Sequence, residues 1–128
     1  MAIVKQGGAA TYRVGKVFSF EAGHQLVGHD GKCAREHGHS YKVEVVLERN
    51  SLIMQGPKTG MVLDFGDLSV IVKSLIDEQL DHHKLKCTAE QLASYIFDRV
   101  QAELHQSRAV VGRVRVWETA DSWAEYEL

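Results

Sequence analysis

Three histidines have the residue type and spacing needed to bind one metal ion. His37 and His39 lie two positions apart in an alternating segment, and residues two apart on a β-strand project from the same face. His24 ends the apolar side of the preceding alternating segment. If the two segments pair as a hairpin, three imidazoles converge, and three protein ligands with an open fourth position are typical of catalytic zinc. The spacing therefore predicts a Zn²⁺ site made by His24, His37 and His39.

A cysteine stands close to this predicted site in the sequence. Cys33 precedes His37 by four positions and lies in a polar loop with Lys32 and Arg35. Positive neighbours stabilise a thiolate, which favours a catalytic role in acid–base or nucleophilic chemistry. The alternative is that Cys33 is a fourth zinc ligand, which would close the site and argue against catalysis. We interpret the second cysteine, Cys87, as having no role in the chemistry.

Two further positions carry groups that could act on a ligand. Asp81 precedes His82 at the end of a predicted helix, where a carboxylate can orient an imidazole for proton transfer, although such a pair is also common on protein surfaces. Glu118 shares the inward parity of Val114 and Val116, and a carboxylate on an apolar face needs a partner. That partner is either a structural cation or a ligand with adjacent N–H donors, such as the guanidine-like edge of a heterocycle.

The elements that position these residues follow from hydrophobic periodicity. Period-two alternation predicts four strands, over residues 12–24, 39–48, 110–118 and 123–128. Helical spacing predicts one helix from Asp64 to about Asp81 and a second that begins at Thr88, where Gln91 completes a capping box, and includes Leu104. The order β-β-α-α-β-β predicts an α+β fold with a four-stranded antiparallel sheet and two helices on one face.

The composition is that of one ordinary globular domain over residues 1–128. The chain has 15 basic and 17 acidic residues and is 45% hydrophobic. No apolar run approaches the roughly 20 residues needed to cross a bilayer, and the first residues lack the apolar stretch of a signal peptide, so we expect a cytoplasmic protein without a membrane partner. A near-neutral charge balance gives no broad surface for nucleic acid. Any anionic ligand must therefore meet a local cluster of basic residues.

The motifs together resemble the 6-pyruvoyltetrahydropterin synthase / 6-carboxytetrahydropterin synthase family. Six stretches match in order and cover nearly the whole chain: Phe18–His24, Gly31–His39, Gly60–Leu68, Leu80–His83, Thr88–Ala93 and Val116–Tyr126. The resemblance implies a tunnelling fold (T-fold) whose trimers close a β-barrel and stack into a homohexamer, with active sites between subunits. The implied site consists of the residues singled out above: zinc ligands His24, His37 and His39, catalytic Cys33, Asp81 and His82, and the pterin anchor Glu118.

The spacing within one motif is similar to a particular branch of that family. Three residues separate Cys33 from His37, which looks like the bacterial 6-carboxytetrahydropterin synthases. That branch implies conversion of 7,8-dihydroneopterin triphosphate to 6-carboxy-5,6,7,8-tetrahydropterin, with release of acetaldehyde and triphosphate, in queuosine (7-deazaguanine) biosynthesis. Lys32, together with Arg35 and His29, could meet the triphosphate.

Two alternatives remain open at the level of sequence. Only Lys86 and Cys87 separate Leu85 from Thr88, where members of the family usually have a longer loop that ends in proline. This difference leaves room for another reaction of the family, such as 6-pyruvoyltetrahydropterin formation or a different cleavage of the pterin side chain. A different class of function is a non-catalytic binding module that zinc stabilises.

Overall fold

The computed structural model describes residues 10–31, 35 and 37–128. Lys32 and Cys33 therefore lie outside the described residues. The elements in chain order are β1 (Tyr12–His24), β2 (His37–Arg49), α1 (Phe65–Leu75), the π-helical turn η2 (Ile76–Leu80), β3 (Lys84–Leu85), α2 (Ala89–Glu103), β4 (Val110–Trp117) and β5 (Trp123–Tyr126). Within the described part of the chain, no helix has both the length and the apolar character needed to cross a bilayer.

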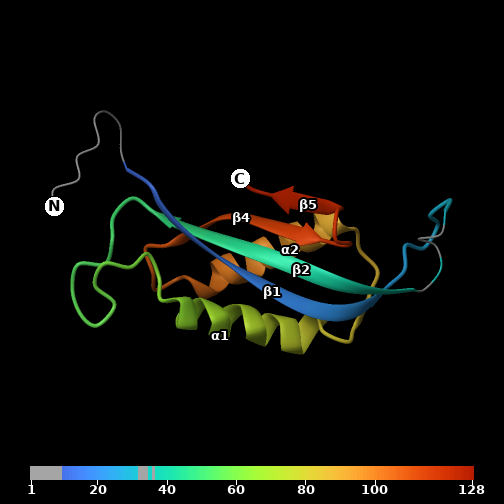
Figure 1. Cartoon of the computed structure of the whole chain (residues 1–128), viewed down its shortest axis with the longest axis horizontal. Helices are drawn as coiled ribbons and strands as arrows, with labels where there is room; N and C mark the ends of the chain where they lie inside the picture. Colours follow the sequence, from blue (N-terminus) through green and yellow to red (C-terminus); the bar gives the residue numbers. More distant parts are fainter. Residues whose placement is uncertain (1–9, 32–34, 36) are drawn as a thin grey trace.

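The long hairpin of β1 and β2 is the framework of the molecule. Its two strands pair antiparallel from Tyr12 opposite Arg49 to His24 opposite His37. Side chains of one parity, including Phe18 and Phe20, are buried, whereas the intervening ones are mostly exposed. One face of the sheet is therefore buried, and both helices lie on that face of the twisted sheet (Figure 1).

The sheet has one strand more than the sequence predicts. Its order is β3-β1-β2-β4-β5, and β3 pairs parallel to β1, so the predicted four-stranded antiparallel sheet is corrected to a mixed sheet of five strands. The backbone N–H groups of Gly23 and Gln25 donate to the carbonyls of His83 and Leu85 at 2.9 and 3.0 Å, which supplies partners at an edge that would otherwise be open. A strand of two residues is too short to show a period in the sequence.

The first helix begins as predicted but does not end as a regular α-helix. The Asp64 side chain accepts a hydrogen bond from the Gly66 N–H at 2.7 Å and caps α1. After Leu75 the chain continues through the π-helical turn η2, which ends where the Asp81 N–H donates to the Ile76 carbonyl at 2.7 Å. Such turns are frequent beside functional sites, and this one leads directly into the Asp81–His82 pair.

The second helix begins with the predicted capping box. The Thr88 hydroxyl accepts from the Gln91 N–H at 3.1 Å, and the Gln91 side chain accepts from the Thr88 N–H at 2.9 Å. We expect Thr88→Ala to lower the free energy of unfolding by about 1 kcal/mol, because the Gln91 N–H loses its acceptor. Urea denaturation measures the change. Ser94→Ala on the same helix is the control, since its hydroxyl only contacts the carbonyl of Gln91; equal losses in both variants would contradict the capping role.

Candidate metal centre and active site

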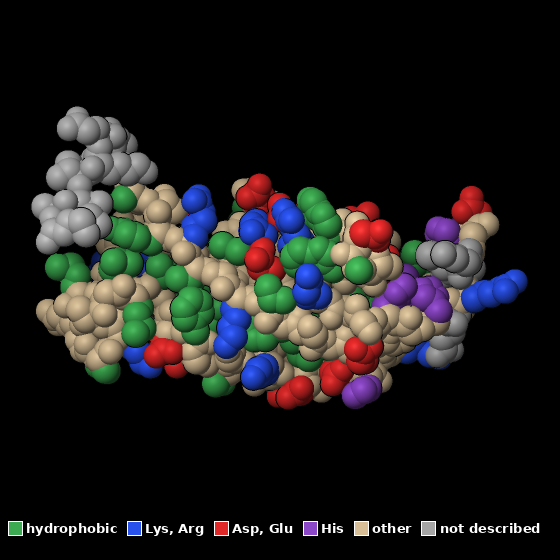
Figure 2. Space-filling view, in the orientation of Figure 1, with side chains coloured by type: hydrophobic (Ala, Val, Ile, Leu, Met, Phe, Trp, Pro, Cys, Tyr) green, Lys and Arg blue, Asp and Glu red, His purple; other side chains and the backbone are tan. Residues whose placement is uncertain are grey.

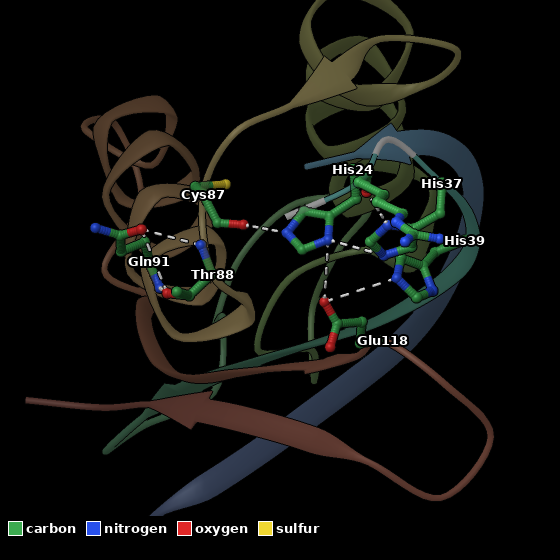
Figure 3. A network of polar contacts seen from close by, with 8 residues as sticks. His24, His37, His39, Cys87, Thr88, Gln91 and Glu118 are labelled. Carbon is green, nitrogen blue, oxygen red and sulfur yellow. Dashed lines mark hydrogen bonds and ion pairs between the residues drawn. The ribbon is translucent and has the colours of Figure 1, made fainter. Parts of the chain in front are cut away.

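The three histidines predicted to bind a metal converge at one end of the sheet. The hairpin register places His24 opposite His37, and His39 follows two residues later on β2. One ring nitrogen from each lies within 4.8 Å of the other two, and Figure 3 shows the three rings turned toward one another. Figure 2 shows histidine side chains gathered at this end of the molecule. The arrangement can hold one metal ion.

Backbone carbonyls hold two of these imidazoles from outside the cluster. The Nε2–H of His24 donates to the Cys87 carbonyl at 2.8 Å, and the Nδ1–H of His37 donates to the Arg35 carbonyl at 2.7 Å. A neutral imidazole carries one proton, so these bonds fix the tautomers and leave His24 Nδ1 and His37 Nε2 as acceptors facing inward. Metal-binding histidines typically have such an outer partner.

The inward nitrogens require a cation between or beside them. His24 Nδ1 and His37 Nε2 lie 3.3 Å apart, and with both tautomers fixed their lone pairs face each other. That contact is repulsive unless a proton or a metal ion is shared. Three neutral nitrogen donors from rigid strands match the ligand set of a catalytic zinc ion. The residues present therefore fit Zn²⁺.

Glu118 lies beside the histidines at the end of β4. Its Oε1 is 3.6 Å from His24 Nδ1 and 3.9 Å from His39 Nε2. Figure 3 shows this oxygen directed at the imidazoles and the second oxygen directed away from them. The side chain is 28% exposed, so the second oxygen can meet a ligand. This oxygen faces the same inward nitrogen atoms, so a cation held by the histidines would be the partner predicted for the carboxylate, and Glu118 is a candidate fourth metal ligand.

A cavity of about 280 Å³ adjoins this carboxylate on the side of α2 and β5. Glu118 forms part of its wall together with Glu90 at the start of α2 and the half-exposed indole of Trp123. A flat aromatic ligand could lie against the indole while its N–H donors meet a carboxylate oxygen. The site therefore combines a candidate metal centre with a candidate acceptor for a heterocycle edge.

Two other ionisable groups near the cluster remain protonated at neutral pH. Burial raises the pKa of the Tyr41 phenol, and the charge of Glu118 acts in the same direction. Burial likewise raises the pKa of the Cys87 thiol. A neutral thiol is neither a good nucleophile nor a good zinc ligand, which agrees with the interpretation of the Cys87 side chain from sequence. What sequence reasoning missed is the Cys87 carbonyl, because a backbone acceptor has no residue signature.

The Asp81–His82 pair is fixed to the edge of β1. The Glu21 N–H donates to Asp81 Oδ1 at 3.0 Å, and the His82 N–H donates to the Glu21 carbonyl at 2.6 Å. His82 Nε2 lies 3.4 Å from Asp81 Oδ2, as expected for a carboxylate that orients an imidazole. His82 also has a φ of 60°, a backbone conformation that non-glycine residues seldom adopt away from constrained, often functional, positions.

The His82 side chain is exposed beside the histidine cluster. It is 79% exposed, and it lines a cavity of about 390 Å³ together with His39 and Ser40. The shared cavity connects the Asp81–His82 pair with the histidine cluster. The two remaining predicted site residues, Cys33 and Lys32, belong to the part of the chain that is not described.

Comparison with known proteins identifies the class to which this fold and site belong. A family model described as 6-pyruvoyl tetrahydropterin synthase matches residues 13–128. A 6-carboxy-5,6,7,8-tetrahydropterin synthase from Haemophilus influenzae is 35% identical over 143 residues, covering 91% of this chain and 99% of that protein. One from Synechocystis sp. is 38% identical over 122 residues, covering 87% and 89%. The chain belongs to the 6-pyruvoyl tetrahydropterin synthase family, which confirms the resemblance inferred from its motifs.

Solved structures confirm the fold. The 6-pyruvoyl tetrahydropterin synthase of Caenorhabditis elegans superposes with a TM-score of 0.77 at 26% identity, covering 93% of this chain and 96% of that one. An uncharacterised protein from Wolinella succinogenes gives a TM-score of 0.80 at 21% identity, covering 92% and 98%. The predicted α+β tunnelling fold with two helices on one face of the sheet is therefore correct.

Proposed function

We propose that this protein is a zinc-dependent lyase that converts 7,8-dihydroneopterin triphosphate to 6-carboxy-5,6,7,8-tetrahydropterin. The reaction consumes one water molecule and releases acetaldehyde and triphosphate, and it belongs to queuosine (7-deazaguanine) biosynthesis in the cytoplasm. The observation that carries the proposal is the three-histidine cluster, with two outer N–H groups fixed by backbone carbonyls and a carboxylate alongside. The names of the Haemophilus and Synechocystis relatives support the choice of reaction.

Different residues bind the metal and the pterin in the proposed reaction. His24, His37 and His39 hold the zinc ion, which polarises oxygen atoms of the substrate when it is bound. Glu118 accepts hydrogen bonds from the amino-pyrimidinone edge of the pterin through the oxygen that faces away from the imidazoles. Its proximity to Trp123 across the adjoining cavity supports this placement.

Proton transfer is assigned to groups on two sides of the substrate. Cys33 removes or donates a proton at the pterin side chain, and His82, oriented by Asp81, serves the opposite side. The exposure of His82 supports an active site that neighbouring subunits complete, as expected for a homohexamer built from two trimers. Lys32 meets the triphosphate as a local positive charge. The proposal involves neither nucleic acid nor a membrane.

The mass of the product tests the proposed reaction against its nearest alternative. The family model carries the name of 6-pyruvoyl tetrahydropterin synthase, so formation of 6-pyruvoyltetrahydropterin is the second candidate. Purified zinc-loaded protein is incubated with 7,8-dihydroneopterin triphosphate, and the pterin product is analysed by mass spectrometry under anaerobic conditions. A 6-carboxy product supports the proposal. A 6-pyruvoyl product would replace it with the second candidate.

Glu118→Gln separates two roles that the geometry allows for this carboxylate. If Glu118 anchors the pterin, we expect zinc content to be retained and KM to rise by about 10- to 100-fold, since a charge-assisted hydrogen bond is lost. Zinc content and steady-state kinetics are measured on the same preparation. Glu90→Gln, in the wall of the same cavity, is the matched control and should leave KM nearly unchanged. Loss of zinc from Glu118→Gln would show instead that Glu118 is a metal ligand.

A further inference from the structure

A second cavity lies at the end of the sheet opposite the histidines. It has a volume of about 550 Å³ and is bounded by the last residue of β2, Arg49, by the connection that follows it, and by the loop between α2 and β4. His37 and Arg49 are the first and last residues of the 13-residue strand β2, which places them roughly 40 Å apart at the usual rise per residue. Figure 1 shows the β2–α1 connection at the end of the molecule remote from the β1–β2 loop. The two sites are therefore separate.

Arg49 lines this cavity and carries an unsatisfied side-chain donor. Its Nε is buried, and among the described residues it has no hydrogen-bond partner. Buried side-chain donors in folded proteins nearly always have a hydrogen-bond partner. A guanidinium carries only donors, so a partner for Arg49 Nε must be an acceptor. An oxygen of a bound anion supplies such an acceptor in the geometry that arginine favours.

The charge on the cavity wall points to the same kind of ligand. Arg108 also lines the cavity, whereas no acidic side chain in the described part of the chain does. Over residues 10–31, 35 and 37–128, neither Arg49 nor Arg108 forms an ion pair; by contrast, Arg13 and Arg115 each contact a glutamate. Two arginines that have no carboxylate partner among the described residues therefore line one cavity.

The remaining wall combines hydroxyl groups with apolar side chains. Ser51 and Ser107 contribute hydroxyls, and because the Ser107 Oγ already accepts from the Ala109 N–H at 3.0 Å, its hydrogen is left to donate. Leu52 and Ile53 contribute apolar surface. A ligand that satisfies all of these groups has a charged oxygen-bearing head and an apolar body.

We propose that this cavity binds a small organic anion. Its phosphate or carboxylate group is held by Arg49 and Arg108, with the Ser107 hydroxyl as a further donor, and its apolar part lies against Leu52 and Ile53. The site is distinct from the metal centre and does not depend on the reaction proposed above. It provides a place at which a metabolite can bind without entering the active site.

Calorimetry on the zinc-loaded full-length protein tests the proposal with three probes. Phenyl phosphate and benzoate share an aromatic body but differ in head group, and inorganic phosphate carries the head group alone. We expect saturable binding of phenyl phosphate or of benzoate, whichever head group the cavity favours, and weaker binding of inorganic phosphate. Arg49→Gln should weaken the binding of the preferred probe by about tenfold or more, because a charge-assisted donor pair is lost.

Arg99→Gln, on the exposed face of α2, is the matched control for Arg49→Gln because it removes the same charge elsewhere. Its affinity for the preferred probe should equal that of the parent protein. Thermal unfolding and zinc content verify that each variant is folded. If Arg49→Gln does not fold, Arg108→Gln on the exposed loop takes its place with the same expected loss. Equal affinity in the cavity variant and in Arg99→Gln would overturn the proposal, as would the absence of saturable binding of both aromatic probes up to about 10 mM.

Discussion

Replacing His24 with alanine is expected to abolish zinc binding and, with it, turnover. His24 is fully buried, its Nδ1 faces His37, and its Nε2–H is fixed by the Cys87 carbonyl. The variant loses one of three ligands together with the contact that orients it. We expect zinc affinity to fall by more than the roughly 10- to 100-fold that loss of an outer partner alone costs. Metal analysis after dialysis against a weak chelator measures zinc per subunit, and the rate of acetaldehyde release from 7,8-dihydroneopterin triphosphate measures turnover.

The control for this variant is His105→Ala. His105 is exposed just beyond the end of α2, where its Nδ1 contacts the Ala102 carbonyl. Its replacement removes an imidazole from the chain without touching the cluster, so zinc content and turnover should match those of the parent. Full zinc occupancy in a folded His24→Ala protein would show that the metal is bound elsewhere.

Cys33→Ala is expected to keep its zinc and to lose turnover by about 10²- to 10⁴-fold, the usual contribution of one acid–base group. The expectation follows from a site in which three histidines hold the metal and the thiol acts on the substrate. Zinc content and kcat are measured on the same sample. Cys87→Ala is the matched control, because the chain contacts His24 through the Cys87 carbonyl rather than through its thiol.

The opposite outcome for Cys33→Ala would support a different class of protein. If zinc is lost along with the thiol, Cys33 is a fourth ligand, and four protein ligands make a closed structural site. A closed site favours the non-catalytic binding module over the lyase. Retained zinc with unchanged turnover would instead remove Cys33 from the mechanism.

The parity of the two long strands explains why the convergence of the three histidines could be predicted from sequence. Alternation fixes which face each side chain occupies, and a register that aligns the apolar faces of β1 and β2 also places His24 opposite His37. The capping box of α2 could also be predicted from sequence, because Thr88 and Gln91 are specific residue types at a fixed spacing.

Other parts of the site depend on contacts that no residue pattern encodes. Strand β3 has two residues and exists because β1 offers backbone groups at its edge. The Cys87 carbonyl is a backbone atom, so its contact with His24 depends on where the chain passes rather than on which residue stands there. The parity of Glu118 predicted a buried carboxylate, but only the fold shows that one of its oxygens faces the imidazoles.

Zinc-dependent release of acetaldehyde and triphosphate is the defining property of the proposed lyase. Zinc is removed from the purified protein with a chelator and returned in steps while 7,8-dihydroneopterin triphosphate is present in excess. We predict that both products form in equal amounts and that the rate of their formation rises with added zinc until each three-histidine site is filled. Full zinc occupancy with neither product formed would contradict this prediction.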